Sequence, residues 1–218
     1  MSTAPLGIFG GTFDPIHFGH LRLAQEMAES LRLGEVRFIP AGTPPHRGAP
    51  QVTAQQRLDM VRLATAGNPL FVVDVREVVR SGPGYTVDTL REMRREEGGD
   101  RPLCLLLGAD AFLDLALWHR WEELFSLANI IVAHRPGFAP AAWAARMPPA
   151  LAHEYAVRLL RAPLNSLPPA GRIGTLPIAA LDISGTMIRD SLAREVSPRY
   201  LLPDAVLEYI GTNHLYMS

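Results

Sequence analysis

Hydrophobic residues follow two alternating patterns along this chain. Short continuous apolar runs are typical of strands buried on both faces, and apolar positions that recur every three or four residues are typical of amphipathic helices. The first pattern predicts strands at residues 6–9, 36–40, 71–75, 103–107, 129–133 and 172–177. The second predicts helices at residues 18–33, 53–66 (with Thr53 as N-cap), 86–97, 110–125 (broken), 141–161, 186–193 and 204–211.

This alternation predicts an α/β fold. Parallel strands need helical crossovers, and strands that are apolar throughout need cover on both faces. We therefore expect a doubly wound, Rossmann-like, mostly parallel sheet with helices on both faces. A length of 218 residues fits a single domain, 1–218. Within it, residues 136–181 are rich in Ala and Pro and predict a loop-rich insertion, and residues 184–211 predict a C-terminal helical segment.

Between the first strand and the first helix the chain reads GGTFDPIHFGH. A strand, a glycine-rich turn and a helix start form a common geometry for holding phosphate. Gly10 and Gly11 allow a ligand to approach the backbone and its N–H groups. His17 and His20 share one face of the first helical turn, and Gly19 between them leaves room for a base or sugar. The turn is therefore a candidate for reacting with phosphate as well as binding it.

Two other interpretations of the histidines remain open at this point. His17, His20 and Asp14 are possible metal ligands, although no third histidine or cysteine lies nearby in the sequence. The histidines could also be a structural pair with satisfied hydrogen bonds in a turn. We favour phosphate chemistry and expect no protein-bound metal.

A second motif, ISGTMIR, lies at residues 183–189. Ser184 is predicted to cap a helix that carries Thr186 and Arg189 in its first turns. Arg189 would then reach an anion bound at the helix start. Taken alone this motif is weak evidence, because the cap by itself explains the serine.

Polar residues also follow two of the predicted strands. His46 and Arg47 come after the second strand, and Gly108 and Asp110 come after the fourth. Loops at the carboxyl ends of strands line the ligand crevice of open α/β sheets, and an acidic residue there often binds ribose hydroxyls. A solvated loop and a helix cap are the simpler explanations. Trp118 offers a flat face on which an aromatic base could stack, and the alternative is a tryptophan buried in the core.

Composition narrows the chemistry. All 21 basic side chains are arginine, which excludes a Schiff base, a lysyl-nucleotide intermediate and a Walker lysine. A net charge of −1 does not suggest an extended nucleic-acid surface. No apolar run is long enough to span a membrane, and the single cysteine, Cys104, cannot form an internal disulfide. We therefore expect a cytoplasmic protein without membrane or nucleic-acid partners, and a homo-oligomer remains open.

Together these residues resemble the nucleotidyltransferase superfamily marked by H-x-G-H near the N-terminus and S-x-T-x-x-R near the C-terminus. The motifs between them are similar to those of the bacterial nicotinate-nucleotide adenylyltransferase family. The resemblance implies transfer of AMP from ATP to nicotinate mononucleotide, giving deamido-NAD and pyrophosphate. It implies in-line displacement without a covalent intermediate and Mg²⁺ bound through the ATP phosphates. The same transfer to nicotinamide mononucleotide or another phosphate acceptor, and a non-catalytic nucleotide sensor, are the alternatives.

The resemblance also implies roles for individual residues. The catalytic residues would be His17, His20 and Arg189, which would bind the reacting phosphates. The ATP site would comprise Gly10, Gly11, Thr12, Phe13, Gly19, Gly108, Asp110, Ser184, Thr186 and Arg189. The acceptor site would comprise His46, Arg47, Tyr85, Thr86, Trp118, His119 and Arg135.

Three positions depart from the family pattern. Arg47 stands where lysine is often found, and His119 stands where tyrosine is frequent. Gly185 replaces a small side chain, which leads us to expect a looser turn. Recognition of the nicotinate carboxylate through backbone N–H groups near Thr86 and His119 would survive these changes.

Overall fold

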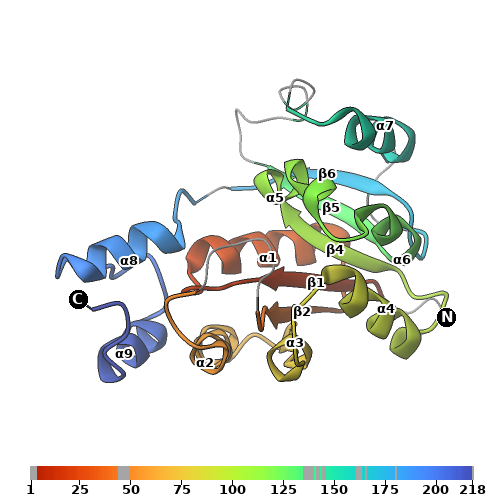
Figure 1. The fold of residues 1–218 in the computed structure, drawn as a ribbon. Helices are drawn as coiled ribbons and strands as arrows, with labels where there is room; N and C mark the ends of the chain where they lie inside the picture. The colour runs from red at the N-terminus through yellow and green to blue at the C-terminus, as the bar shows by residue number, and fades with distance from the viewer. Residues whose placement is uncertain are drawn as a thin grey trace.

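A computed structural model describes residues 4–43, 50–134, 140, 143, 146–160, 164, 166–179 and 181–217. Six strands form one sheet in the order β3-β2-β1-β4-β5-β6 (Figure 1). The strands are β1 (Leu6–Gly11), β2 (Glu35–Pro40), β3 (Phe71–Val73), β4 (Leu103–Gly108), β5 (Asn129–His134) and β6 (Ile173–Pro177). Each pairing is parallel, so the predicted doubly wound sheet is confirmed.

The helices follow the predicted pattern with two differences. They are α1 (Phe18–Leu31), α2 (Ala54–Thr65), α3 (Arg76–Val79), α4 (Thr86–Glu97), α5 (Ala109–Leu113), α6 (Leu124–Leu127), α7 (Pro149–Arg158), α8 (Gly185–Ala193) and α9 (Asp204–Thr212). The helix predicted at 110–125 is broken, as expected, by short 3₁₀ turns at Leu115–Leu117 and Trp121–Glu123. The single turn α3 was not predicted.

Of the helix predicted at 141–161, residues 149–158 are helical, whereas the described residues 143 and 146–148 are not, and 141, 142, 144, 145 and 161 lie outside the described residues. Helix α7 begins at Pro149, just after a turn and a bend at residues 146–147. Proline has no N–H and fits only the first turn of a helix, so the Pro148–Pro149 pair sets the start. This segment also carries β6, which pairs with β5 at the sheet edge, so residues 136–181 are more than loops.

The helices cover both faces of the sheet. Helices α1 and α2 pack on one face, and α4, α5, α6 and α7 pack on the other, while α8 and α9 extend the cluster of the first face beyond the strand ends (Figure 1). Side chains of β4 alternate between them, since Cys104 and Leu106 join the first cluster while Leu103, Leu105 and Leu107 join the second. This two-sided burial is why the strands are continuously apolar. We propose one domain, 1–218, because the two clusters share a single sheet.

Candidate active site

The strand order places a crevice at one edge of the sheet. From β1 the order runs to β2 and β3 on one side and to β4, β5 and β6 on the other. Ligands of open α/β sheets bind outside the carboxyl ends of the strands where the order reverses in this way. The segment 10–20 begins in the last two residues of β1, and Gly108 to Asp110 begin with the last residue of β4, so both candidate groups flank this point. Helices α8 and α9 lie beyond the same strand ends (Figure 1).

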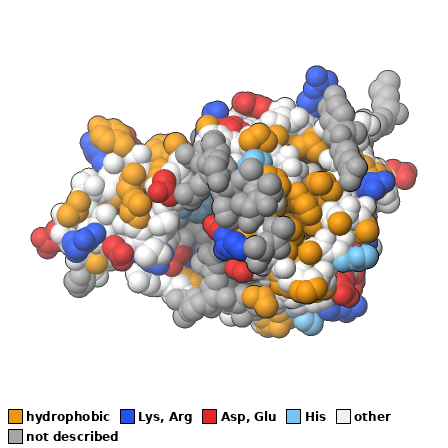
Figure 2. Space-filling model, turned by 90° about the horizontal axis from the view of Figure 1, so that it is seen from above, with side chains coloured by type: hydrophobic (Ala, Val, Ile, Leu, Met, Phe, Trp, Pro, Cys, Tyr) orange, Lys and Arg blue, Asp and Glu red, His pale blue; other side chains and the backbone are white. Residues whose placement is uncertain are grey.

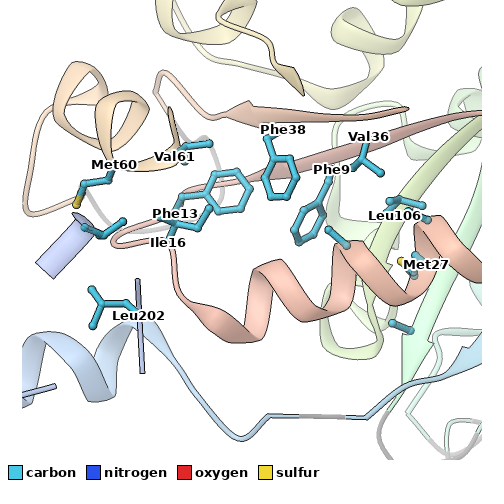
Figure 3. Close-up of a cluster of buried hydrophobic side chains, with 14 of the residues drawn as sticks. Phe9, Phe13, Ile16, Met27, Val36, Phe38, Met60, Val61, Leu106 and Leu202 are labelled. Atoms are coloured by element: carbon cyan, nitrogen blue, oxygen red, sulfur yellow. The ribbon is translucent and has the colours of Figure 1, made fainter. Parts of the chain in front are cut away.

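The turn after β1 is anchored by a buried ring. Phe13, with a left-handed φ of 50°, is 2% exposed. Its ring centroid lies 5.6 Å from that of Phe9 and 5.1 Å from that of His20. Figure 3 shows the Phe13 ring among Phe9, Phe38 and Ile16, inside the core. The Phe13 side chain is therefore not available to ATP, and only its backbone can face a ligand. We call residues 12–15 the phosphate loop.

The two histidines lie face to face at the start of α1. Their ring centroids are 3.7 Å apart with an interplanar angle of 29°. The backbone N–H of His17 donates to Nδ1 of His20 at 3.3 Å. Burial lowers the pKa of His17 to about 4, so the ring is neutral at pH 7. Within the described chain its Nδ1 is buried without a hydrogen-bond partner. A neutral His17 can bind phosphate through a hydrogen bond but does not add a charge.

The start of α1 contacts the C-terminal part of the chain. A methyl group added at Gly19 would lie 3.0 Å from the His17 ring and 3.5 Å from the carbonyl oxygen of Ile183. The Phe18 N–H donates to the carbonyl of Leu201 at 3.0 Å. This amide is therefore occupied by protein, while the glycine keeps the two segments close.

Arg189 reaches the phosphate loop from helix α8. Its Nη1 donates to the carbonyl oxygen of Asp14 at 2.6 Å, and its Nη2 donates to Oγ1 of Thr186 at 3.3 Å. Ser184 caps the helix as predicted, since its Oγ accepts from the Met187 N–H at 3.1 Å. The fold thus joins the two sequence motifs, which are 175 residues apart at this contact.

Gly185 allows a close approach at this contact. A methyl group added there would lie only 2.8 Å from the Asp14 carbonyl oxygen and 3.3 Å from Nη1 of Arg189. The looser turn expected from the sequence at Gly185 is not the effect that these close distances indicate. The glycine instead brings the first turn of α8 against the phosphate loop.

Asp14 joins three segments of the chain. Its Oδ1 accepts a hydrogen bond from the Tyr216 hydroxyl at 2.6 Å, and its Oδ2 accepts from the Gln51 N–H at 3.2 Å. Burial and this carboxylate raise the pKa of the Tyr216 phenol, which stays protonated. Tyr216 could not be identified from the sequence, because a lone tyrosine belongs to no distinctive pattern. Within the described residues, no cluster of three or more His, Cys, Asp or Glu side chains could hold a metal ion.

The residues that follow β4 are open to a ligand. Gly108 is the N-cap of α5, and because it is a glycine it has no side chain that could cap the helix. A methyl group added at Gly108 would meet no described atom within 4 Å. Asp110 is exposed in the first turn of α5. Its carboxylate therefore faces solvent at the reversal point of the sheet.

The acceptor residues that can be placed gather near the start of α4. Thr86 is the first residue of this helix, and its N-cap, Tyr85, makes no side-chain cap. The N–H groups of this first turn are thus suited to an anion. The His119 ring lies 4.3 Å from the Tyr85 ring at 32°. Trp118 is half-buried and packs against the same core cluster as Tyr85.

Three predicted acceptor residues lie outside the described part of the chain: His46, Arg47 and Arg135. The buried residue Glu77 lies next to Gly42, which precedes His46 and Arg47 in the chain. Glu77 accepts a hydrogen bond from the Thr89 hydroxyl at 2.6 Å, and burial raises its pKa. A methyl group added at Gly84 would lie 2.8 Å from the Glu77 carboxylate. Glu77 therefore supports both the first turns of α4 and the turn before it.

Surface charge agrees with a local anion site. On the face shown in Figure 2, Arg side chains are scattered among Asp and Glu, and hydrophobic side chains gather on one half. That face thus presents no continuous basic area among its described residues. Across the described chain, no helix combines the length and the apolar character needed to cross a membrane.

Comparison with known proteins gives consistent relatives. A family model described as cytidylyltransferase-like matches residues 8–191. A protein named probable nicotinate-nucleotide adenylyltransferase from Dechloromonas aromatica (strain RCB) is 57% identical over 216 residues, which is 98% of each chain. One of the same name from Laribacter hongkongensis (strain HLHK9) is 49% identical over 213 residues, covering 98% of this chain and 94% of that one.

The fold also has solved relatives. The Plasmodium falciparum nicotinic acid mononucleotide adenylyltransferase complexed with NaAD superposes with a TM-score of 0.72 at 17% identity, covering 98% of both chains. The same protein complexed with APC gives a TM-score of 0.71 at 16% identity, again over 98% of both chains. At these identities the superpositions bear on the fold alone.

Proposed function

The chain belongs to the nicotinate-nucleotide adenylyltransferases of the cytidylyltransferase-like family, and we propose that segments 10–20 and 184–189 form its reaction site. The enzyme transfers AMP from ATP to nicotinate mononucleotide in NAD biosynthesis, giving deamido-NAD and pyrophosphate. The observation that carries the site is the contact between Arg189 and the Asp14 carbonyl at the reversal point of the sheet.

We assign the ATP phosphates to the turn after β1. The backbone of Gly10, Gly11, Thr12 and Phe13 would face them, and Gly19 would keep the His17 ring and the segment before α8 close to them. His17 would bind as a neutral donor, since its pKa lies near 4 in the free protein. His20, which is stacked on His17, would lie nearest the reacting α-phosphate and stabilise the charge that develops there.

Arg189, Ser184 and Thr186 would hold the leaving pyrophosphate. An arginine fork suits two phosphate oxygens at once. In the free protein Arg189 donates to Asp14 and Thr186, and its Nε is buried without a partner among the described residues. The guanidinium is therefore already placed at the phosphate loop before ATP binds. Gly108 and the exposed Asp110 carboxylate would hold the ribose of ATP.

We propose that the acceptor occupies the region of α4. The uncapped first turn, beginning at Thr86, would receive the nicotinate carboxylate. Trp118 would stack on the pyridine ring, with Tyr85 and His119 beside it. His46, Arg47 and Arg135 would neutralise the acceptor phosphate and carboxylate. Preference for the acid over the amide follows if an anion binds this turn.

Magnesium is proposed to arrive bound to ATP. The described residues offer no metal-binding cluster, and the Asp14 carboxylate is already engaged by Tyr216 and Gln51. Mg²⁺ keeps several waters and is often held chiefly by substrate phosphates, so this chain fits an ion carried by its substrate. When bound, the ion neutralises phosphate charge.

A cytoplasmic location, expected from the lone cysteine, stays a prediction.

In the proposed step, an oxygen of the nicotinate mononucleotide phosphate attacks the α-phosphorus of ATP. The new O–P bond forms as the bond from the α-phosphorus to the bridging oxygen breaks, and pyrophosphate leaves with that electron pair. A lysyl-AMP intermediate is excluded because the chain has no lysine. Positioning and charge stabilisation would supply the catalysis.

Stereochemistry tests this step. ATP carrying sulfur on a chiral α-phosphorus is converted with nicotinate mononucleotide, and the configuration of the dinucleotide is determined by ³¹P NMR. A single displacement inverts the configuration. Retention would mean two successive displacements and a covalent intermediate, which would contradict the proposal.

A further inference from the structure

Helix α2 buries an arginine beneath the phosphate loop. Arg57 is 1% exposed, and it lies on the same stripe of the helix as Met60 and Val61, which are fully buried. Removing a guanidinium from water costs several kcal/mol unless its hydrogen bonds are well satisfied. An apolar side chain would be the ordinary occupant of this position, so the arginine calls for an explanation.

The Arg57 guanidinium donates hydrogen bonds to two loops, and in both loops the acceptor is a backbone carbonyl and not a carboxylate. Its Nη1 donates to the carbonyl oxygen of Thr12 at 2.7 Å, and its Nη2 donates to that of Gly42 at 3.0 Å. Its Nε is buried and has no partner among the described residues. Among the described residues, none forms an ion pair with Arg57. Burial lowers the pKa of Arg57, and the negative charge of Asp14 offsets only part of this lowering.

The two carbonyls belong to the loops that serve the two substrates. Thr12 opens the phosphate loop, and Gly42 follows β2 just before the segment that holds His46 and Arg47. In a planar peptide the C=O of one residue and the N–H of the next point in opposite directions. Fixing the Thr12 carbonyl therefore turns the Phe13 N–H away from Arg57. The same argument holds for Gly42 and the Thr43 N–H.

Gly42 is also held from its other side. A methyl group there would lie 2.1 Å from the carbonyl oxygen of Glu77, and the Gly84 N–H donates to the Thr43 carbonyl at 3.2 Å. The segment that Arg57 holds is thus in direct contact with the turn that leads into α4. One guanidinium connects the ATP side of the site with its acceptor side.

We propose that Arg57 is a positioning residue for adenylyl transfer, which fixes the spacing between the phosphate loop and the segment after β2. This inference rests on the proposed function of those two loops. Its planar fork holds both carbonyls at once, which the single ammonium of a lysine cannot do with the same geometry. Its buried positive charge also favours phosphate at the loop above it.

The test compares Arg57→Lys with Arg62→Lys. Arg62 lies on the same helix, is exposed and pairs only with Asp59 in the described structure, so it is the matched control. Thermal unfolding first establishes that each variant is folded. Binding of the α,β-methylene analogue of ATP with Mg²⁺ is then measured by calorimetry, followed by steady-state kinetics with ATP and nicotinate mononucleotide.

For Arg57→Lys we expect analogue binding weakened about tenfold and kcat lowered by roughly 10–100-fold, since displacing reacting groups by about 1 Å has effects of this size. Both KM values should rise, because both loops lose their fixed position. A role in stability alone would lower the melting temperature and the active fraction but leave both KM values unchanged. Arg62→Lys should match the wild type in every measurement.

A second variant guards against misfolding. Arg57→Ala leaves space for a free guanidinium, so about 50 mM methylguanidine should restore part of its kcat, whereas neutral urea at the same concentration should not. The proposal is overturned if Arg57→Lys binds the analogue and turns over like the wild type. It is also overturned if the fraction of activity lost by Arg57→Lys equals the fraction of that protein that is unfolded. A wild type that binds the analogue but forms no dinucleotide would refute the proposed function, and the binding comparison would still decide the role of Arg57.

Discussion

The buried, neutral state of His17 makes stability depend on pH in a defined window. Burial lowers the pKa of this ring from 6.5 to about 4. In the unfolded chain His17 takes up a proton as the pH falls through 6.5, whereas in the folded protein it stays neutral until about pH 4. The stabilising contribution is therefore fully present above pH 6.5 and is lost as the pH falls toward 4.

The magnitude follows from the two pKa values. At about 1.4 kcal/mol per pH unit, the whole difference amounts to about 3 kcal/mol, of which about 2 kcal/mol is lost by pH 5. The perturbation is His17→Asn, because asparagine is an accepted N-cap and does not titrate. The assay is urea denaturation of wild type and variant at pH 7.5, 6 and 5.

We expect the wild type to lose about 2 kcal/mol more than His17→Asn between pH 7.5 and pH 5. Other groups titrate alike in both proteins and cancel in this comparison. His153→Asn, at an exposed position on α7, is the control and should follow the wild type. A constant difference between wild type and His17→Asn at all three pH values would refute the assignment of His17 as buried and neutral.

Two further predictions concern the contacts to Asp14. Arg189→Ala should weaken binding of ATP far more than binding of AMP, because only ATP presents β- and γ-phosphates to the guanidinium; equal losses, measured by calorimetry, would contradict its role at the leaving group. Tyr216→Phe should lower the free energy of unfolding by about 1.5–3 kcal/mol, the usual contribution of a hydrogen bond to a charged group, and should raise the KM for ATP as Asp14 loses a partner. Tyr200→Phe, at an exposed tyrosine, should change neither quantity.

The elements of the fold follow largely from hydrophobic periodicity. All six strands and the long helices α1, α2 and α4 lie where that pattern places them, because each buries a continuous run or a regular stripe. The start of α7 was misplaced because two prolines outweigh the periodicity of the residues before them. The turn α3 is too short to carry a periodic pattern at all.

The site was only partly accessible to sequence reasoning. The histidine turn and the Ser184–Arg189 motif are local patterns, and the fold was needed to show that they meet at Asp14. Tyr216 acts through a contact across 202 residues that no local pattern signals. Arg57 did leave a signal, a charge on the apolar stripe of α2, but hydrophobic periodicity identifies only the apolar members of such a stripe.

Adenylyl transfer at the histidine turn is tested most directly by one comparison. Wild type and His20→Ala are incubated with ATP, Mg²⁺ and nicotinate mononucleotide, and deamido-NAD and pyrophosphate are quantified. We expect equimolar products from the wild type, and turnover about 10²–10⁴-fold lower in a His20→Ala protein whose melting temperature is little changed. Near-wild-type turnover of the folded variant would remove His20, and with it this turn, from the chemistry.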